Sequence, residues 1–124
     1  MYILLADDSQ LIRRNLINLI SRIEGVEQIA EAEDVPHTVE QIRRSLPDVV
    51  ILDLQMPGGS GLDVLTYIKE QKIDVNVIVL TNYVTEYYKK KSLELGAQHF
   101  FDKSTEFPKV ITLLSSMNIT QKET

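Results

Sequence analysis

The chain has 124 residues, of which 44% are hydrophobic, and this length and composition fit one domain with its own core. It contains no cysteine and only two histidines, which excludes a disulfide framework and a thiolate metal site and disfavours a zinc site built on histidine. A formal charge of −5 disfavours direct nucleic-acid binding, and no apolar run reaches the roughly 20 residues that cross a bilayer.

Short apolar runs alternate with longer amphipathic stretches along the sequence. Residues 2–6 form a run too short for a helix and predict a buried strand. Apolar residues at helical spacing predict a helix over residues 12–23, with Ser9 as its N-cap and Gly25 as its C-terminal stop. Residues 26–33 predict a second strand, whose polar residues favour the edge of a sheet.

The second half continues this alternation. Pro36 suits the first turn of a helix over residues 36–46, and residues 48–53 predict a strand covered on both faces. Proline and glycine keep the loop that follows from being helical. The remaining expected elements are helices at 62–72, 84–95 and 107–117 and strands at 75–80 and 97–102. A domain over residues 1–118 would then be followed by a polar tail at 119–124, which we expect to fray.

Five strands that alternate with helices predict an α/β fold, in which a doubly wound parallel sheet carries helices on both faces. Ligands bind such sheets at the carboxyl ends of the strands. The polar residues that stand at those ends are Asp7, Asp8, Asp53, Thr81 and Lys103. Three carboxylates, a hydroxyl and an ammonium would therefore share one edge of the sheet.

Each of these residues also has an ordinary structural explanation. Asp8 and Thr81 could cap helices, Asp53 could start a turn, and Lys103 could be a solvated surface lysine. Their joint placement favours a site, because unrelated polar residues would be divided between the two edges of the sheet.

The chemistry of such a cluster points to a metal and a phosphoryl group. Close carboxylates repel each other by roughly 4 kcal/mol per pair at an effective dielectric constant of about 20. A hard cation such as Mg²⁺ relieves this repulsion through oxygen ligands, and the Gln55 carbonyl could complete the set. An aspartate beside the cation can attack phosphorus, and Thr81 and Lys103 can then donate to the phosphoryl oxygens.

These residues resemble the receiver domains of two-component response regulators. The acidic pair, the aspartate, the threonine and the lysine follow the order of that family, and the loop from Asp53 to Gly61 resembles its D-x-x-M-P-x-x-x-G motif. The resemblance covers essentially the whole chain and implies a flavodoxin-like sheet of strand order 2-1-3-4-5. It also implies a phosphoacceptor rather than an enzyme, which catalyses only its own phosphotransfer and autodephosphorylation. The phosphodonor would be a sensor histidine kinase or a histidine phosphotransfer protein.

The resemblance assigns roles to individual residues. Asp53 would be the phosphoacceptor, and Thr81 and Lys103 would hold the phosphoryl group. The ligands of Mg²⁺, or of Mn²⁺ as an alternative, would be Asp7, Asp8, Asp53 and the backbone carbonyl of Gln55.

The same resemblance implies a switch and a partner surface. Phe100 matches the aromatic residue whose rotamer changes on activation, and Thr81 moving toward the phosphoryl group would open space for this ring. The family binds protein targets through a face that residues 83–117 build here. We expect a cytoplasmic monomer or a weak phosphorylation-dependent dimer, without contact to nucleic acid or membrane.

Three features depart from the family pattern. Ser104 follows Lys103, where the family usually has a proline joined by a cis peptide; a non-proline cis bond costs about 3–4 kcal/mol, which leaves a trans or a strained bond open. Asn82 is bulkier than the small residue common after the threonine. Gln55 and Tyr83 occupy positions that tune dephosphorylation in the family. None of these changes removes a required residue.

Two other classes of protein share this kind of fold. A flavin or dinucleotide binder cradles phosphate after its first strand, where Asp7 and Asp8 would repel it. A haloacid-dehalogenase-type phosphatase also forms an aspartyl phosphate with Mg²⁺, but its second acid is replaced here by Gln55. Within the receiver family we favour a stand-alone regulator, because the polar residues 121–124 suit a natural end. The alternative is a fragment of a longer regulator with a DNA-binding output domain.

Overall fold

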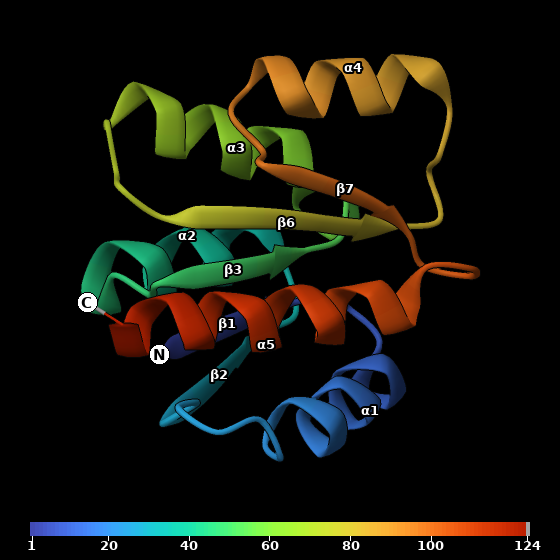
Figure 1. The fold of residues 1–124 in the computed structure, drawn as a ribbon. Helices are drawn as coiled ribbons and strands as arrows, with labels where there is room; N and C mark the ends of the chain where they lie inside the picture. Colours follow the sequence, from blue (N-terminus) through green and yellow to red (C-terminus); the bar gives the residue numbers. More distant parts are fainter. Residues whose placement is uncertain (124) are drawn as a thin grey trace.

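The computed structural model describes the backbone of residues 1–123 and the side chains of residues 1–117. A five-stranded sheet of order β2-β1-β3-β6-β7 forms its centre, and all neighbouring strands in this sheet are parallel (Figure 1). Its strands are β1 (Tyr2–Ala6), β2 (Gln28–Ala32), β3 (Val49–Leu52), β6 (Asn76–Thr81) and β7 (His99–Asp102). The structure confirms the predicted flavodoxin-like order and places β2 at a sheet edge.

Five helices cover the two faces of the sheet (Figure 1). Helices α1 (Gln10–Ile20) and α5 (Phe107–Glu123) lie on one face, and α2 (Val35–Ser45), α3 (Gly61–Glu70) and α4 (Glu86–Glu94) lie on the other. Side chains of successive strand residues point to opposite faces of the sheet and therefore pack into two separate cores. In β1, for example, Ile3 and Leu5 belong to the core beneath α1 and α5, whereas Leu4 and Ala6 belong to the other core.

Side-chain caps fix where the helices begin, and so hold the loops at the carboxyl edge of the sheet. The Ser9 hydroxyl accepts the Ile12 N–H at 3.2 Å, which confirms Ser9 as the N-cap of α1. Pro36 lies in the first turn of α2, as predicted. Ser60 and Asp63 form a reciprocal capping box at the start of α3.

Several predicted boundaries were wrong. Helix α1 ends at Ile20 with Ser21 as its C-cap, so Gly25 is not its stop. The loop after β3 contains a small antiparallel hairpin of two short strands, β4 (Gln55–Met56) and β5 (Gly59–Ser60), that periodicity did not indicate.

At the carboxyl end of the chain, α5 runs to Glu123 instead of ending near Met117. The predicted polar tail, residues 119–124, falls on residues whose side chains lie outside the described part. Every peptide bond in the described residues is trans, including the bond between Lys103 and Ser104. Among the described helices, none is both long and apolar enough to cross a membrane.

Candidate functional site

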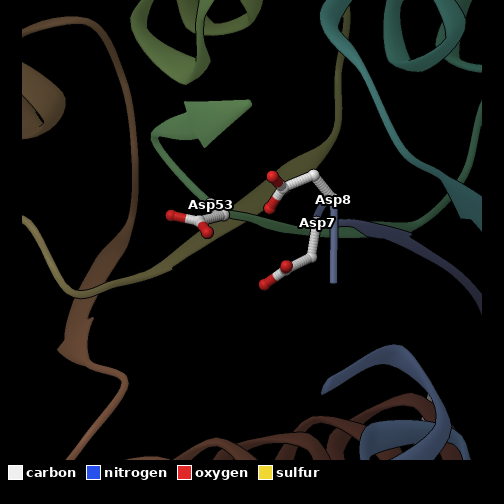
Figure 2. A group of neighbouring side chains, drawn as sticks. All are labelled: Asp7, Asp8 and Asp53. Atoms are coloured by element: carbon white, nitrogen blue, oxygen red, sulfur yellow. The ribbon is translucent and has the colours of Figure 1, made fainter. Parts of the chain in front are cut away.

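Three aspartates from two adjacent strands meet at the carboxyl edge of the sheet (Figure 2). Asp7 and Asp8 follow β1 directly, and Asp53 follows β3. The Asp53 N–H donates to the Ala6 carbonyl at 2.9 Å, which fixes the two strand ends side by side. One carboxylate oxygen from each aspartate lies within 4.8 Å of those of the other two. Asp7 and Asp53 are buried and Asp8 is exposed, so the cluster opens to solvent on the side of Asp8.

The Lys103 ammonium joins the two buried carboxylates. Its Nζ lies 2.6 Å from Asp7 Oδ2 and 2.7 Å from Asp53 Oδ2, and the Lys103 side chain is only 10% exposed. Lys103 directly follows β7, and its N–H donates to the Thr81 carbonyl at 2.9 Å. The structure therefore brings together the lysine and the carboxylates that the sequence predicted to share one edge.

One ammonium shared between buried carboxylates leaves the site short of positive charge. Burial opposes the charged form of Lys103, but hydrogen bonds to Asp53 and Asp7 outweigh it and raise the Lys103 pKa. Burial raises the pKa of Asp7 and the neighbouring Asp53 charge adds to this, while Lys103 and the Ser9 N–H oppose the rise without cancelling it. Three carboxyl groups with one lysine make a donor set that fits a hard divalent cation.

The Thr81 hydroxyl completes the surroundings of Asp53. It is fully buried and donates a 2.8 Å hydrogen bond to Asp53 Oδ1, the same oxygen that accepts the Gln55 N–H at 3.1 Å. The other oxygen, Oδ2, faces Lys103. Each Asp53 oxygen thus has a donor beside it, and the backbone of Gln55, the predicted carbonyl ligand, lies next to the carboxylate.

Gly61 explains the final glycine of the loop motif. A Cβ at this position would lie 2.5 Å from the Asp53 carbonyl oxygen and 2.8 Å from the Leu54 Cα, both of them backbone atoms that cannot yield easily. The Gly61 N–H donates to the Leu54 carbonyl at 2.9 Å. Only glycine therefore lets the start of α3 pack against the backbone of the phosphoacceptor candidate.

Arg13 is a residue of the site that the sequence interpretation missed. Its guanidinium is buried and donates from Nη1 to the Asp7 carbonyl at 2.6 Å and from Nε to Glu31 Oε1 at 2.9 Å. The buried residues of α1 are Arg13, Leu16 and Ile20. An arginine in register with those two apolar residues, at i, i+3 and i+7, was the available signal.

Phe100 lies on β7, two residues before Asp102, which pairs with Thr81 across the ladder. Its ring is half-buried and packs against the core beneath α2, α3 and α4. The sequence placed Phe100 and Thr81 on the last two strands of the sheet, and the structure places these strands side by side.

Comparison with known proteins matches residues 3–115 to the response regulator receiver domain family. The chain is 29% identical to response regulator UvrY of Escherichia coli K12 over 93% of its own length and 53% of that protein. It is 35% identical to the transcriptional regulatory protein YdfI of Bacillus subtilis over 83% of its own length and 48% of that protein. The chain thus spans about half the length of these curated relatives.

Solved structures agree with this match. A DNA-binding response regulator of the LuxR family from Staphylococcus aureus superposes with a TM-score of 0.85 at 25% identity, covering 94% of this chain and 98% of that one. The response regulator domain of Thermotoga maritima CheB gives 0.82 at 26% identity, covering 97% and 94%. With the sheet order and the acidic site already established, these matches show that the chain belongs to the response regulator receiver domain family.

Proposed function

We propose that Asp53 accepts a phosphoryl group from a phosphohistidine in a reaction that requires Mg²⁺, and that the phosphorylated form changes its protein partners. The observation that carries this proposal is the setting of Asp53. Its carboxylate is buried, faces two further aspartates, and has a hydroxyl donor on one oxygen and an ammonium on the other. The phosphodonor would be a sensor histidine kinase or a histidine phosphotransfer protein.

In the transfer step, an Asp53 carboxylate oxygen forms a bond to phosphorus while the bond from phosphorus to the donor imidazole nitrogen breaks. The electron pair of that bond stays on the imidazole nitrogen. The Thr81 hydroxyl and the Lys103 ammonium already lie beside the two Asp53 oxygens, so both are placed to donate to the new phosphoryl oxygens. Thr81 and Lys103 would hold the phosphorylated Asp53 side chain and orient its phosphoryl group.

Asp7, Asp8, Asp53 and the Gln55 carbonyl would hold the Mg²⁺, or Mn²⁺ in its place. A bound divalent cation supplies positive charge for the phosphoryl oxygens, which one lysine alone cannot balance. Exposed Asp8 leaves the metal side of the cluster accessible from solvent, while buried Asp7 is fixed by the Ser9 N–H at 2.8 Å.

Residues 83–117 are the proposed face for protein targets. Tyr83, Val84 and Tyr87 are large, exposed residues beside the start of α4. The Tyr88 ring stacks on Tyr83 at 5.3 Å between centroids and meets the edge of Tyr87 at 5.2 Å. Exposed aromatic side chains held rigid by their neighbours are suited to protein contacts. We infer a cytoplasmic monomer, or a weak dimer when phosphorylated, that contacts neither nucleic acid nor membrane directly.

The first candidate for the output is a stand-alone regulator that consists of the receiver domain at residues 1–118. The second candidate is the receiver part of a longer regulator with a DNA-binding domain. It is favoured by the curated relatives, which are about twice as long and include a transcriptional regulatory protein. A matched solved structure also carries the name of a DNA-binding response regulator, although its chain is about as long as this one. The length of the intact gene product decides between the two.

Intact mass measured after incubation with phosphoramidate and Mg²⁺ tests the phosphoacceptor. We expect one added phosphoryl group on the wild type and none on Asp53→Asn. Asp48→Asn is the matched control, because Asp48 is an exposed aspartate at the opposite end of β3. Equal labelling of Asp53→Asn and wild type would refute the assignment. Sustained turnover of a phosphomonoester would instead favour the phosphatase alternative.

A further inference from the structure

The segment around Lys103 is closed by an interlocked set of hydrogen bonds. Asp102 Oδ1 accepts the Ser104 N–H at 2.9 Å and the Ser104 hydroxyl at 2.7 Å. The Asp102 carbonyl accepts the Glu106 N–H at 2.8 Å, and the Glu106 carboxylate in return accepts the Asp102 N–H at 3.0 Å. Asp102 and Ser104, on the two sides of Lys103, are therefore hydrogen-bonded to each other. Asp102 is also bonded to Glu106, which directly precedes α5.

Lys103 needs such a constraint because its own side chain is flexible. The ammonium stands at the end of a four-carbon stem, so the protein can aim it only by fixing the backbone from which it starts. On one side, the Lys103 N–H is held by the Thr81 carbonyl at 2.9 Å. On the other side of Lys103, the proline that is usual in the family would fix its own φ angle through its ring. Ser104 has no such ring, and the hydrogen bonds to Asp102 constrain the backbone here instead.

We propose that Asp102, acting through Ser104, is the positioning residue that aims Lys103 between Asp7 and Asp53. This inference rests on the proposed function, in which Lys103 holds the phosphoryl group. Asp102 does not touch the carboxylate cluster in any described contact; it acts on the backbone that carries Lys103. Hydrogen bonds from the Ser104 hydroxyl and amide hold the pKa of Asp102 below its usual range, so Asp102 is a charged acceptor at neutral pH.

Reactivity of the Lys103 amine gives a direct readout of its position that does not depend on phosphotransfer. Acetylation with an amine-reactive ester, followed by peptide mass spectrometry, would compare Lys103 with exposed Lys90 as an internal reference. In the wild type, Lys103 is covered and bonded to two carboxylates, and we expect slow labelling. Asp102→Ala should raise its labelling rate about tenfold relative to Lys90, the effect of losing a charge-assisted hydrogen bond.

Matched variants separate positioning from loss of charge or of stability. Asp102→Asn keeps an acceptor oxygen for Ser104 and should label close to the wild-type rate. Ser104→Ala removes the hydroxyl, one of the two donors to Asp102, and should increase the labelling rate of Lys103 by less than Asp102→Ala does. This variant provides the readout if Asp102→Ala fails to fold. Asp74→Ala removes an exposed aspartate just before β6, at the amino ends of the strands, and should leave the labelling rate of Lys103 unchanged.

Phosphorylation by phosphoramidate gives the second readout. We expect Asp102→Ala to slow the reaction about tenfold in the wild-type background and to have no further effect in a Lys103→Ala background. A general structural defect would slow both backgrounds alike and would overturn the inference, as would wild-type labelling of Lys103 in Asp102→Ala. If the wild type accepts no phosphoryl group but Asp102→Ala still exposes Lys103, the positioning role stands and the proposed function fails.

Discussion

The Thr81 hydroxyl donates a 2.8 Å hydrogen bond to Asp53 Oδ1 and at the same time accepts the N–H of Tyr83 at 3.2 Å. One buried side chain thus connects the proposed phosphoacceptor to the first residues of the segment that leads into α4. A change in the hydrogen bond between Thr81 and Asp53 would therefore act directly on the backbone at Tyr83. This connection runs through a single hydroxyl, so a single substitution can remove it.

Arg13→Met should destabilise the fold and weaken metal binding together. The substitution leaves the Asp7 carbonyl without its 2.6 Å donor in a buried position. An unsatisfied buried group costs about 1–3 kcal/mol, and we expect a loss of that size in urea denaturation. Because the same contact fixes the backbone of a proposed metal ligand, half-saturation by Mg²⁺ should also move to higher concentration.

Arg14→Met is the matched control for that prediction. Arg14 is the next residue of α1, carries the same charge, and is exposed. It should leave both unfolding and Mg²⁺ binding near wild type. Equal effects of the two substitutions would show that charge, rather than the contact with Asp7, is responsible.

Removal of Mg²⁺ should lower stability through the acidic cluster. At ten times the dissociation constant, binding to the folded state contributes about 1.4 kcal/mol. Asp8→Asn should lose most of this gain, while the metal-free variant should be at least as stable as wild type because one repelling charge is gone. Thermal unfolding with Mg²⁺ and with a chelator measures both. Glu33→Gln, an exposed acid directly after β2, is the control. An identical Mg²⁺ shift in Asp8→Asn would contradict the metal site.

The raised pKa of Asp7 gives a signed pH dependence. Between about pH 4, the usual carboxyl value, and the raised value, the folded protein binds more protons than the unfolded chain. Stability of the metal-free protein should therefore fall as pH rises through this window. Stabilisation by Mg²⁺ should grow over the same window, because the ligand must be ionised.

Urea denaturation at successive pH values, with chelator or with Mg²⁺, measures these two slopes. Asp7→Asn removes the titrating group, so the difference between wild type and this variant isolates its contribution. A metal-free difference that is flat across the window would argue against a raised pKa at Asp7.

Sequence patterns located the strands more accurately than the ends of the helices. β1 has the predicted bounds because a short apolar run that stops at the polar pair Asp7 and Asp8 leaves little choice. The helical pattern of α1 continued to Ile23, although the helix ends at Ile20. Ile23 still packs against the core beneath α1 and α5, and its N–H donates to the Ile20 carbonyl in a turn. Apolar spacing reports burial, and burial continues where the helical hydrogen bonds stop.

For the site, the strand ends predicted which residues meet but not how they bond. A parallel sheet brings Asp7, Asp53 and Lys103 to one edge, so that part followed from topology alone. The sharing of one ammonium between two carboxylates depends on side-chain rotamers, which the sequence pattern does not specify. The helical spacing of Arg13 with Leu16 and Ile20 is a signal of its burial, but not of its contact with a backbone carbonyl. The bonds of Ser104 to Asp102 are equally local and do not follow from residue spacing.

The last prediction concerns the switch, in which we expect Phe100 to respond to the state of Asp53 through Thr81. A phosphoryl group offers strong acceptors beyond the Asp53 oxygens, and the Thr81 hydroxyl must shift toward them to keep donating. That shift would vacate volume beside β7. Phe100 is already half-buried and has no hydroxyl that must stay in water. An inward ring should therefore be well populated before phosphorylation, so that activation shifts an existing equilibrium.

Fluorine NMR with fluorophenylalanine measures this shift, with beryllofluoride as the phosphoryl mimic. The chain has three phenylalanines, and the other two, Phe101 and Phe107, pack on the opposite core as internal controls. The mimic should move the Phe100 signal most in wild type, less in Thr81→Ala, and nearly as in wild type in Thr81→Ser, which keeps the hydroxyl. An unchanged Phe100 signal with Asp53 fully occupied would rule out this switch, because the ring would then be independent of the site.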